Sequence, residues 1–244
     1  MQKIWVCGAR GQIGQAVNDV VDKLEFEMLD TDVDDLDVTD TDEVLRFGEM
    51  NRPDIIINCS GMTDISSCEE NPSQAFKVNA LGARNLAIVA AKMQAKMVQL
   101  STDDVFDGKS TEPYTEFDIT NPGTVYGKSK LAGENYVKEF TTKHFIVRST
   151  WVYGKGQNFI NGFLKKVDAG EQLSIASDQF GSPTSANELA RFLLHLVHTS
   201  EYGTYHATNK GVCSRYAFAQ EILKMTGKTA SMQPVPTVMS DFSK

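Results

Sequence analysis

The chain has 244 residues, of which 41% are hydrophobic and 23% charged, and this composition is ordinary for a globular protein with a large core. Its net charge of -8 argues against a nucleic-acid-binding surface, and no apolar run approaches the roughly 20 residues of a membrane-spanning helix. The first residues lack the layout of a signal peptide, so we expect a cytoplasmic protein with no nucleic-acid or membrane partner.

Strand-like apolar runs alternate with stretches of helical periodicity through the first 150 residues. The predicted strands cover residues 3–7, 25–29, 54–58, 96–101 and 144–148. The predicted helices between them cover residues 13–24, 41–50, 72–93 and 125–141. This alternation predicts an α/β fold, a Rossmann-type doubly wound parallel sheet with helices on both faces. Ligands of such sheets bind beyond the carboxyl ends of the strands.

The alternation loosens after residue 153. The later pattern predicts helices at 158–167, 185–198 and 214–225, strands at 172–176 and 204–207, and a loop at 178–184. Ser185, followed three residues later by Glu188, matches a capping box at the start of the second of these helices. We predict an NAD(P)-binding Rossmann domain over residues 1–150. Residues 151–244 would supply the remaining Rossmann elements and a small, partial substrate-binding lobe.

The sequence contains no convincing metal site. Its four cysteines, Cys7, Cys59, Cys68 and Cys213, include no CxxC pair, which favours free thiols over disulfides or a metal centre. His195 and His198 are three residues apart on a predicted helix, but no third ligand completes a set. We therefore expect no bound metal.

A glycine-rich motif, Gly8-Ala9-Arg10-Gly11-Gln12-Ile13-Gly14, follows the first predicted strand and opens a helix. Its spacing lets the backbone turn tightly and approach a pyrophosphate at the helix N-terminus. Asp32 is the first candidate to bind the adenosine ribose, and Asp30 is the second. An acid here favours NADH, whereas Arg10 could pair with the 2'-phosphate of NADPH. The sequence does not decide between NADPH and NADH.

Tyr126 and Lys130 lie four residues apart on one face of a predicted helix. A free tyrosine has a pKa of roughly 10, and we expect the nearby ammonium to lower that pKa. Thr102 adds a hydroxyl at the carboxyl end of a predicted strand, where it can donate to a carbonyl oxygen that gains negative charge. These residues predict a reductase in which a tyrosine handles the proton and a dinucleotide the hydride.

The ordered motifs resemble those of the dTDP-4-dehydrorhamnose reductases, a family of extended short-chain dehydrogenases/reductases. The resemblance covers nearly the whole chain and rests on G-A-R-G-Q-I-G, L-D-V-T, S-T-D-x-V-F-D-G, V-Y-G-K-S-K-L-A-G-E, R-S-T-W-V-Y-G, N-F, D-Q-F-G-S-P-T and G-T-Y-H. It implies that Tyr126 donates the proton and that Lys130 is its partner and holds the nicotinamide ribose. It also implies that Thr102 binds the C4 carbonyl, and that Asp103 and Trp151 contact the substrate.

The same resemblance implies which residues contact the cofactor. They are Gly8, Arg10, Gly11, Gln12, Ile13, Gly14, Asp32, Asp37, Val38, Gly61, Met62, Thr63, Tyr126 and Lys130. The implied reaction is NAD(P)H-dependent reduction of the C4 ketone of dTDP-4-dehydro-L-rhamnose to dTDP-L-rhamnose, a precursor of surface polysaccharides. The implied partner is therefore a nucleotide sugar, and whether the chain forms a homodimer stays open.

The chain departs from the family pattern on the expected substrate side. Asp104 replaces a usual tyrosine, Met62 a histidine or tyrosine, Ser66 an aspartate, and Arg215 a tryptophan. The sequence also ends before an R-P-containing loop and further helices of the family, so we expect an incomplete substrate lobe. Two alternatives remain. One is a reductase of another nucleotide-linked 4-keto-6-deoxy sugar, and the other is a non-catalytic cofactor-binding regulatory subunit resembling the methionine adenosyltransferase β subunit.

Overall fold

A six-stranded parallel sheet forms the centre of the computed structural model, which describes residues 1–241. The strands are β1 (Gln2–Cys7), β2 (Phe26–Thr31), β3 (Ile55–Asn58), β4 (Lys96–Thr102), β5 (His144–Ser149) and β10 (Gly203–His206). Their order is β10-β5-β4-β3-β1-β2, and every neighbouring pair is parallel. The predicted Rossmann-type α/β fold is confirmed. Because β1 connects to β2 on one side and β3 connects to β4 on the other, the connections after β1 and β3 diverge and leave a crevice at the carboxyl ends of these two strands.

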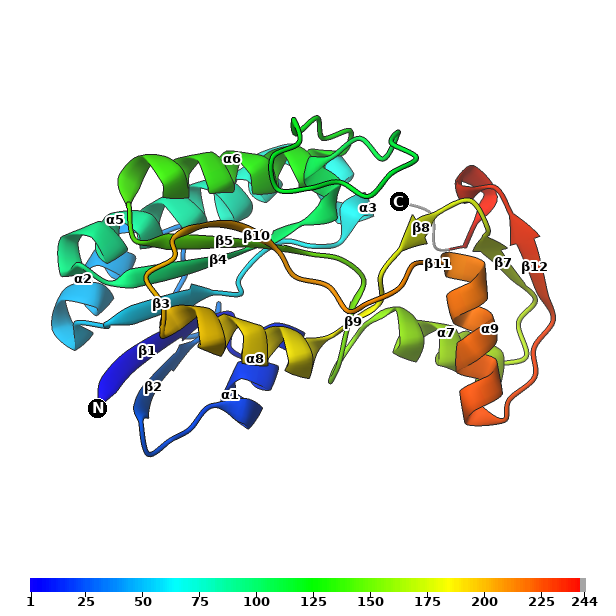
Figure 1. The fold of residues 1–244 in the computed structure, drawn as a ribbon, viewed down its shortest axis with the longest axis horizontal. Helices are drawn as coiled ribbons and strands as arrows, with labels where there is room; N and C mark the ends of the chain where they lie inside the picture. The colour runs from blue at the N-terminus through cyan, green and yellow to red at the C-terminus, as the bar shows by residue number, and fades with distance from the viewer. Residues whose placement is uncertain (242–244) are drawn as a thin grey trace.

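The central strands contribute side chains to two separate hydrophobic cores, one on each face of the sheet. On β3, Ile55 and Ile57 belong to one core and Ile56 to the other, as the two-residue period of a strand requires. All three are buried, which is typical of a strand covered on both faces. The first core is covered by α1 (Gln12–Val20) and α8 (Ala186–Val197), and the second by α2 (Thr41–Asn51), α5 (Ala83–Met93) and α6 (Val125–Phe140) (Figure 1).

The first helix ends earlier than its apolar spacing predicts. α1 stops at Val20, and Val21 is already extended, with φ -67° and ψ 140°. The side chain of Asp22 accepts the backbone N–H of Leu24 at 2.8 Å, a local bond that competes with a further helical turn. Leu24 is 92% exposed, so this apolar residue does not extend the buried face of the helix.

The segment predicted as one helix over residues 72–93 is divided into three elements. It consists of α4 (Pro72–Phe76), a π-helix η1 (Lys77–Gly82) and α5. A π-helical turn holds one more residue than an α-helical turn and is frequent at functional sites. A short helix that the sequence did not predict, α3 (Ile65–Glu70), precedes them, and Asp64 caps it by accepting the Ser67 N–H at 2.8 Å.

The later part of the chain returns to the main sheet with α8 and β10 and also builds a smaller lobe, seen on the right of Figure 1. The lobe holds α7 (Phe159–Asp168), α9 (Arg215–Thr226) and the parallel pair β7 (Leu173–Ala176) and β12 (Met232–Val235). Its own core includes Phe163, Leu173, Ile175, Ala219 and Ile222. Short pairs connect it to the sheet: β8 (Phe180–Gly181) with β11 (Cys213–Ser214), and β6 (Val152–Tyr153) with β9 (Thr184–Ser185).

The predicted capping box at Ser185 is only half right. Ser185 is the N-cap of α8, but its side chain makes no capping hydrogen bond. Glu188 instead lies 3.7 Å from Arg191, one turn further along the helix. The short 3₁₀ helices η2 (Asp103–Val105) and η3 (Thr237–Met239) complete the described elements. Within residues 1–241, no helix has both the length and the apolar character needed to cross a membrane.

Candidate active site

The glycine-rich loop between β1 and α1 has the geometry of a phosphate cradle. Gly8 adopts φ +75°, and a Cβ there would clash with the backbone of Cys59 and Ser60. A Cβ at Gly14 would meet the Gly8 carbonyl oxygen, so both glycines permit close backbone packing. Gly11 caps α1 without any side-chain hydrogen bond, which leaves the first amides of the helix available to an anion.

A cavity of about 400 Å³ opens beside this loop, at the carboxyl ends of β1, β2 and β3. It is lined by seven of the predicted cofactor residues: Gly8, Gly11, Asp32, Asp37, Val38, Gly61 and Met62. The other seven predicted residues lie outside its lining: Arg10, Gln12, Ile13, Gly14, Thr63, Tyr126 and Lys130. Ile13 instead packs against the hydrophobic core beneath α1. The cavity suits the adenosine and diphosphate parts of a dinucleotide, because loop amides and an acid share its wall.

The sequence suggested that Asp32 favours NADH and that Arg10 favours NADPH, but in the structure both residues already have protein partners. The Asp32 carboxylate accepts the backbone N–H of Arg10 at 2.8 Å and that of Val33 at 2.9 Å. The Arg10 guanidinium is already paired, with Nη1 2.7 Å from Asp34 Oδ2 and Nη2 2.8 Å from Asp35 Oδ2. A 2'-phosphate would therefore have to compete with two carboxylates for Arg10.

The predicted catalytic hydroxyls meet at the end of β4. The Tyr126 and Thr102 side chains are hydrogen-bonded to each other. Thr102 ends β4 and caps η2, and its hydroxyl donates to Asp103 Oδ1 at 3.1 Å. Gly127 makes the approach of the two segments possible, because a Cβ there would clash with the carbonyl oxygen of Asp104. The start of α6 is thus packed against η2, directly after β4.

The expectation that Tyr126 has a lowered pKa is wrong for this structure. Burial raises the pKa of Tyr126 well above its ordinary value, the bond to Thr102 opposes this, and Asp104 and Asp103 raise it further. The desolvation of a phenolate therefore outweighs the attraction that an ammonium would supply. Tyr126 is held as a protonated phenol, the form that can donate a proton.

Lys130 connects α6, the helix that carries Tyr126, to the cavity beside the glycine-rich loop. Its side chain is buried, and its Nζ lies 3.7 Å from the position that a Cβ on Gly61 would occupy. Burial lowers the pKa of Lys130 to about 8, and the carboxylate of Glu134 acts in the opposite direction. An ammonium in this position can interact both with Tyr126, one turn earlier on α6, and with a ligand that passes Gly61.

Asn79 is a site residue that the sequence analysis missed. Its Oδ1 accepts the Met62 N–H at 2.8 Å, and its Nδ2 donates to the Met62 carbonyl at 2.9 Å and to Ser129 Oγ at 2.9 Å. Asn79 lies inside the π-helix η1, whose widened turn accompanies this placement. It therefore ties the cofactor loop around Met62 to the catalytic helix. The sequence gives no signal for this role, because the predicted helix over residues 72–93 contains several other polar residues.

A buried ion pair, also missed, supports the catalytic helix from behind. Glu134 is fully buried and accepts Arg148 Nε at 2.9 Å, Arg148 Nη2 at 2.7 Å and Ser101 Oγ at 2.5 Å. These bonds join α6 to β5 and β4, the two strands nearest the catalytic hydroxyls. The Arg148 guanidinium also lies 5.2 Å from the centroid of the Phe106 ring. Sequence spacing does not reveal such a pair, because its members belong to different elements.

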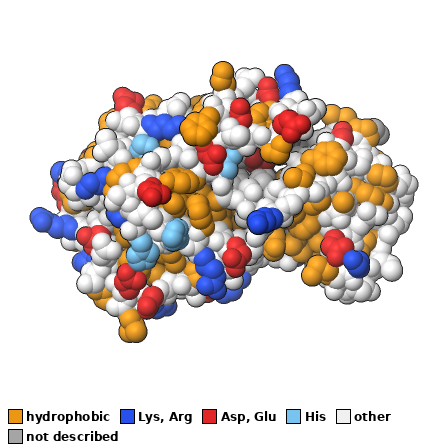
Figure 2. Space-filling view, viewed as in Figure 1, with side chains coloured by type: hydrophobic (Ala, Val, Ile, Leu, Met, Phe, Trp, Pro, Cys, Tyr) orange, Lys and Arg blue, Asp and Glu red, His pale blue; other side chains and the backbone are white. Residues whose placement is uncertain are grey.

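The predicted substrate residues lie where the main sheet meets the smaller lobe. Figure 2 shows a hollow between these two parts, with apolar side chains on its lobe side. Asp103 accepts the hydroxyl of Thr150 at 2.7 Å, and Trp151 follows directly, with φ +46°. The Trp151 ring packs directly against Gly181 of β8, where a Cβ would clash with it. Asp103 and Trp151 therefore flank the approach to Thr102.

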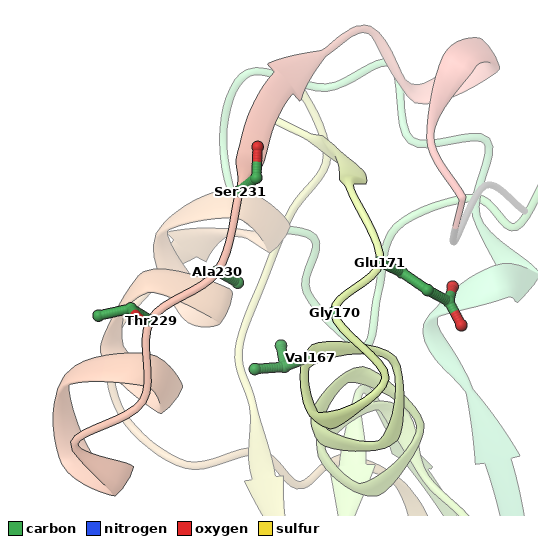
Figure 3. A pocket seen from close by; sticks show the side chains of 6 residues that line it. All are labelled: Val167, Gly170, Glu171, Thr229, Ala230 and Ser231. Carbon is green, nitrogen blue, oxygen red and sulfur yellow. The ribbon is translucent and has the colours of Figure 1, made fainter.

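A second cavity, of about 260 Å³, lies in the lobe and contains none of the predicted site residues. It is lined by Val167, Gly170, Glu171, Thr229, Ala230 and Ser231. The side chains of Glu171 and Thr229 point away from the space between the α7 end and the strand opposite (Figure 3). This cavity offers no converging polar groups and is separate from the catalytic set.

The chain is similar in sequence and in fold to several known proteins. Residues 1–243 match the family model described as RmlD substrate binding domain. The spore coat polysaccharide biosynthesis protein SpsK of Bacillus subtilis is 35% identical over 238 residues, which cover 97% of this chain and 84% of that protein.

Two solved structures extend the comparison. A dTDP-4-dehydrorhamnose reductase from Clostridium acetobutylicum has a TM-score of 0.95 at 43% identity, covering 97% of this chain and 85% of that one. The dTDP-4-dehydrorhamnose reductase of Bacillus anthracis, solved in complex with NADP, has a TM-score of 0.95 at 38% identity, covering 98% and 86%. The chain belongs to the RmlD substrate binding domain family, the family of the dTDP-4-dehydrorhamnose reductases.

Proposed function

We propose that the protein is an NAD(P)H-dependent oxidoreductase that reduces the C4 ketone of dTDP-4-dehydro-L-rhamnose to dTDP-L-rhamnose, for polysaccharide biosynthesis. The observation that carries the proposal is the hydrogen bond between the Tyr126 and Thr102 side chains at the carboxyl end of β4. Lys130, beside Gly61, joins this pair to the cofactor cavity. Support for the substrate comes from the relatives named dTDP-4-dehydrorhamnose reductase.

A nicotinamide dinucleotide would supply the hydride when bound. The chain's residues fit such a ligand, because the amides at the start of α1 face the cavity without a side-chain cap. We propose that the seven predicted residues lining the cavity, together with Tyr126 and Lys130, contact the cofactor directly. For Arg10, Gln12, Ile13, Gly14 and Thr63 the proposed role is to shape the loops around it.

Thr102 and Tyr126 act on the carbonyl oxygen of the substrate. As C4 accepts the hydride, the oxygen gains negative charge, and the Thr102 hydroxyl can stabilise that charge by donating a hydrogen bond. Tyr126 then donates its phenolic proton to the oxygen, so the ketone becomes an alcohol. The phenolate left behind lies one turn before Lys130 on α6, and an ammonium there would favour the charged form while the proton is replaced from solvent. Asp103 and Trp151 would orient the sugar.

The test is a spectrophotometric assay of NADH and NADPH oxidation with dTDP-4-dehydro-L-rhamnose and a panel of other nucleotide-linked 4-keto-6-deoxy sugars. The proposal expects cofactor oxidation with the rhamnose precursor above that with the other sugars. Preference for another sugar would assign the chain to that substrate. Tight cofactor binding without turnover of any sugar would favour a non-catalytic regulatory subunit. A cytoplasmic location and a homodimer stay predictions.

A further inference from the structure

Arg215, the first residue of α9, lies on the lobe side of the substrate approach and has no part in the reaction described above. We propose that Arg215 is a specificity-determining residue whose guanidinium, together with the Asp103 carboxylate, binds hydroxyl groups of the substrate's sugar ring. The inference rests on the proposed function, because it names a contact within the same substrate site.

The fold holds Arg215 both at its backbone and near the end of its side chain. Its backbone N–H donates to the Gln179 carbonyl at 3.0 Å, next to the antiparallel pair β8 and β11. Its Nε donates to Gln179 Oε1 at 3.3 Å. A long side chain that is held at two points loses much of its rotamer freedom before any ligand binds, which lowers the entropic cost of recognition.

Aromatic rings support the guanidinium plane. The Arg215 Cζ lies 3.6 Å from the centroid of the Trp151 ring and 4.8 Å from that of Phe159. Trp151 belongs to the segment that follows β5, whereas Phe159 begins α7, so the stack crosses from the main sheet to the lobe. Guanidinium groups stack well on aromatic faces because they are planar and weakly hydrated.

The guanidinium lies within electrostatic reach of the acids that follow β4. Burial lowers the pKa of Arg215 to about 10, and the carboxylates of Asp103 and Asp104 act in the opposite direction, so these acids lie within electrostatic reach. Arg215 therefore stays cationic at neutral pH. Asp103 is the residue after Thr102 and accepts its hydroxyl. The charged group is thus near the residues beside which the reacting sugar would lie.

The guanidinium of Arg215 has hydrogen-bond donors available for a ligand. Among residues 1–241, Nε of Arg215 has a hydrogen-bond acceptor in Gln179, and its two Nη atoms have none. Each Nη carries two N–H donors in a fixed planar arrangement. A half-buried guanidinium with four available N–H donors, within electrostatic reach of two carboxylates, is suited to a ligand rich in oxygen atoms.

Charge decides which part of a nucleotide sugar this pair would bind. A diphosphate would be attracted by Arg215 but repelled by the Asp103 and Asp104 carboxylates nearby. A sugar hydroxyl is neutral and both donates and accepts, so it can donate to Asp103 and accept from Arg215 at once. Neighbouring hydroxyls on one ring match the forked guanidinium. The sugar is also the part of the substrate that must reach Thr102.

The test compares the equilibrium binding of dTDP-L-rhamnose and of dTDP with NADH present, so that no turnover is needed. In Arg215→Gln we expect affinity for dTDP-L-rhamnose to fall about ten- to a hundredfold, the range for loss of a hydrogen bond to a charged group, while affinities for dTDP and NADH stay unchanged. Arg215→Lys should lose sugar affinity too, because a point charge lacks the fork. Arg191→Gln, an exposed arginine on α8, is the matched control.

Equal weakening of dTDP and dTDP-L-rhamnose would overturn the inference by assigning Arg215 to the phosphates. Unchanged binding of both, or full sugar affinity in Arg215→Lys, would also overturn it. The proposed function fails separately, if the unmodified protein does not oxidise NADH or NADPH with any sugar. In that case a preference for dTDP-L-rhamnose over dTDP that depends on Arg215 would still support the inference.

Discussion

The cofactor cavity is enclosed by backbone that one parallel sheet positions, whereas the substrate hollow is enclosed by side chains from two parts of the chain. At the cavity, Gly8 and Gly14 permit contacts that any Cβ would block. At the hollow, Trp151 comes from the end of β5 and Arg215 from the lobe, and their rings and charges meet only in the folded chain. A site built from backbone can be recognised in the sequence by the spacing of its glycines. A site built from side chains of distant segments has no such spacing.

The difference has a functional consequence. A backbone cradle recognises what all dinucleotides share, because the amides at the start of α1 do not depend on side-chain identity. A site made of side chains can change its ligand by one substitution while the sheet stays intact. In the proposed mechanism, Thr102, Tyr126 and Lys130 act where the two regions meet. Single substitutions can therefore change catalysis, the stability of the fold or the preference for a ligand separately.

The largest expected effect comes from the residues between the two regions. Tyr126→Phe removes the proton donor but keeps the ring, so we expect kcat to fall about 10²- to 10⁴-fold, the usual contribution of general acid–base catalysis. NADH affinity, measured by fluorescence titration, should be unchanged, because the backbone cradle is intact. Full turnover in this variant would remove Tyr126 from the proposed mechanism.

The next largest effect concerns the frame that carries both regions. Glu134→Ala leaves the Arg148 guanidinium buried without its carboxylate. Breaking a buried ion pair in this way costs about 3–5 kcal/mol, so we expect the free energy of unfolding in urea to fall by that amount. Glu139→Ala, at an exposed position on the same helix, is the control and should change it little. Equal values for both variants would mean that the ion pair does not hold α6 on the sheet.

Sequence reasoning was most successful where local spacing determines structure. The five strands of the first half were predicted with ends that differ by at most two residues, because buried β strands are continuous apolar runs. The glycine loop and Thr102 were found through their positions after strands, and Tyr126 through its four-residue spacing from Lys130. The break at Asn79 was missed because its side-chain bonds to Met62 and Ser129 exist only in the folded chain.

The pKa of Tyr126 shows the same limit in the site itself. From spacing alone, a lysine one turn away suggested a lowered value. The sequence does not show how many protein atoms surround the hydroxyl, and in the structure this burial dominates. The role of Arg215 was likewise out of reach, since its contact with Trp151 depends on how the lobe packs against the sheet.

A smaller effect should appear in the pH dependence of catalysis. Lys130 has a pKa of about 8, so kcat/KM should fall about tenfold per pH unit above pH 8 as the ammonium is lost. Glu134 raises that pKa, so Glu134→Gln should lower it and move the falling limb to lower pH. Glu139→Gln should leave the limb in place. A profile that does not respond to Glu134 would separate Lys130 from the titration.

The smallest effect separates the two dinucleotides within the backbone-built region. Asp34→Asn combined with Asp35→Asn removes the two carboxylates that hold the Arg10 guanidinium. Exposed ion pairs are weak, so we expect only a few-fold gain in affinity for NADPH, measured by fluorescence titration, with little change for NADH. Adding Arg10→Ala should abolish the gain. An equal change for both cofactors would mean that Arg10 does not meet the 2'-phosphate.

The central claim is that hydride reaches C4 of the sugar while Tyr126 protonates the oxygen. The most direct measurement uses NADH carrying deuterium at both C4 positions of the nicotinamide, with dTDP-4-dehydro-L-rhamnose as substrate and NMR analysis of the product. We predict one deuterium at C4 of dTDP-L-rhamnose, and none in a parallel reaction with Tyr126→Phe sampled over the same time. Deuterium at another carbon, or NADH oxidation without deuterium in the sugar, would contradict the proposed reaction.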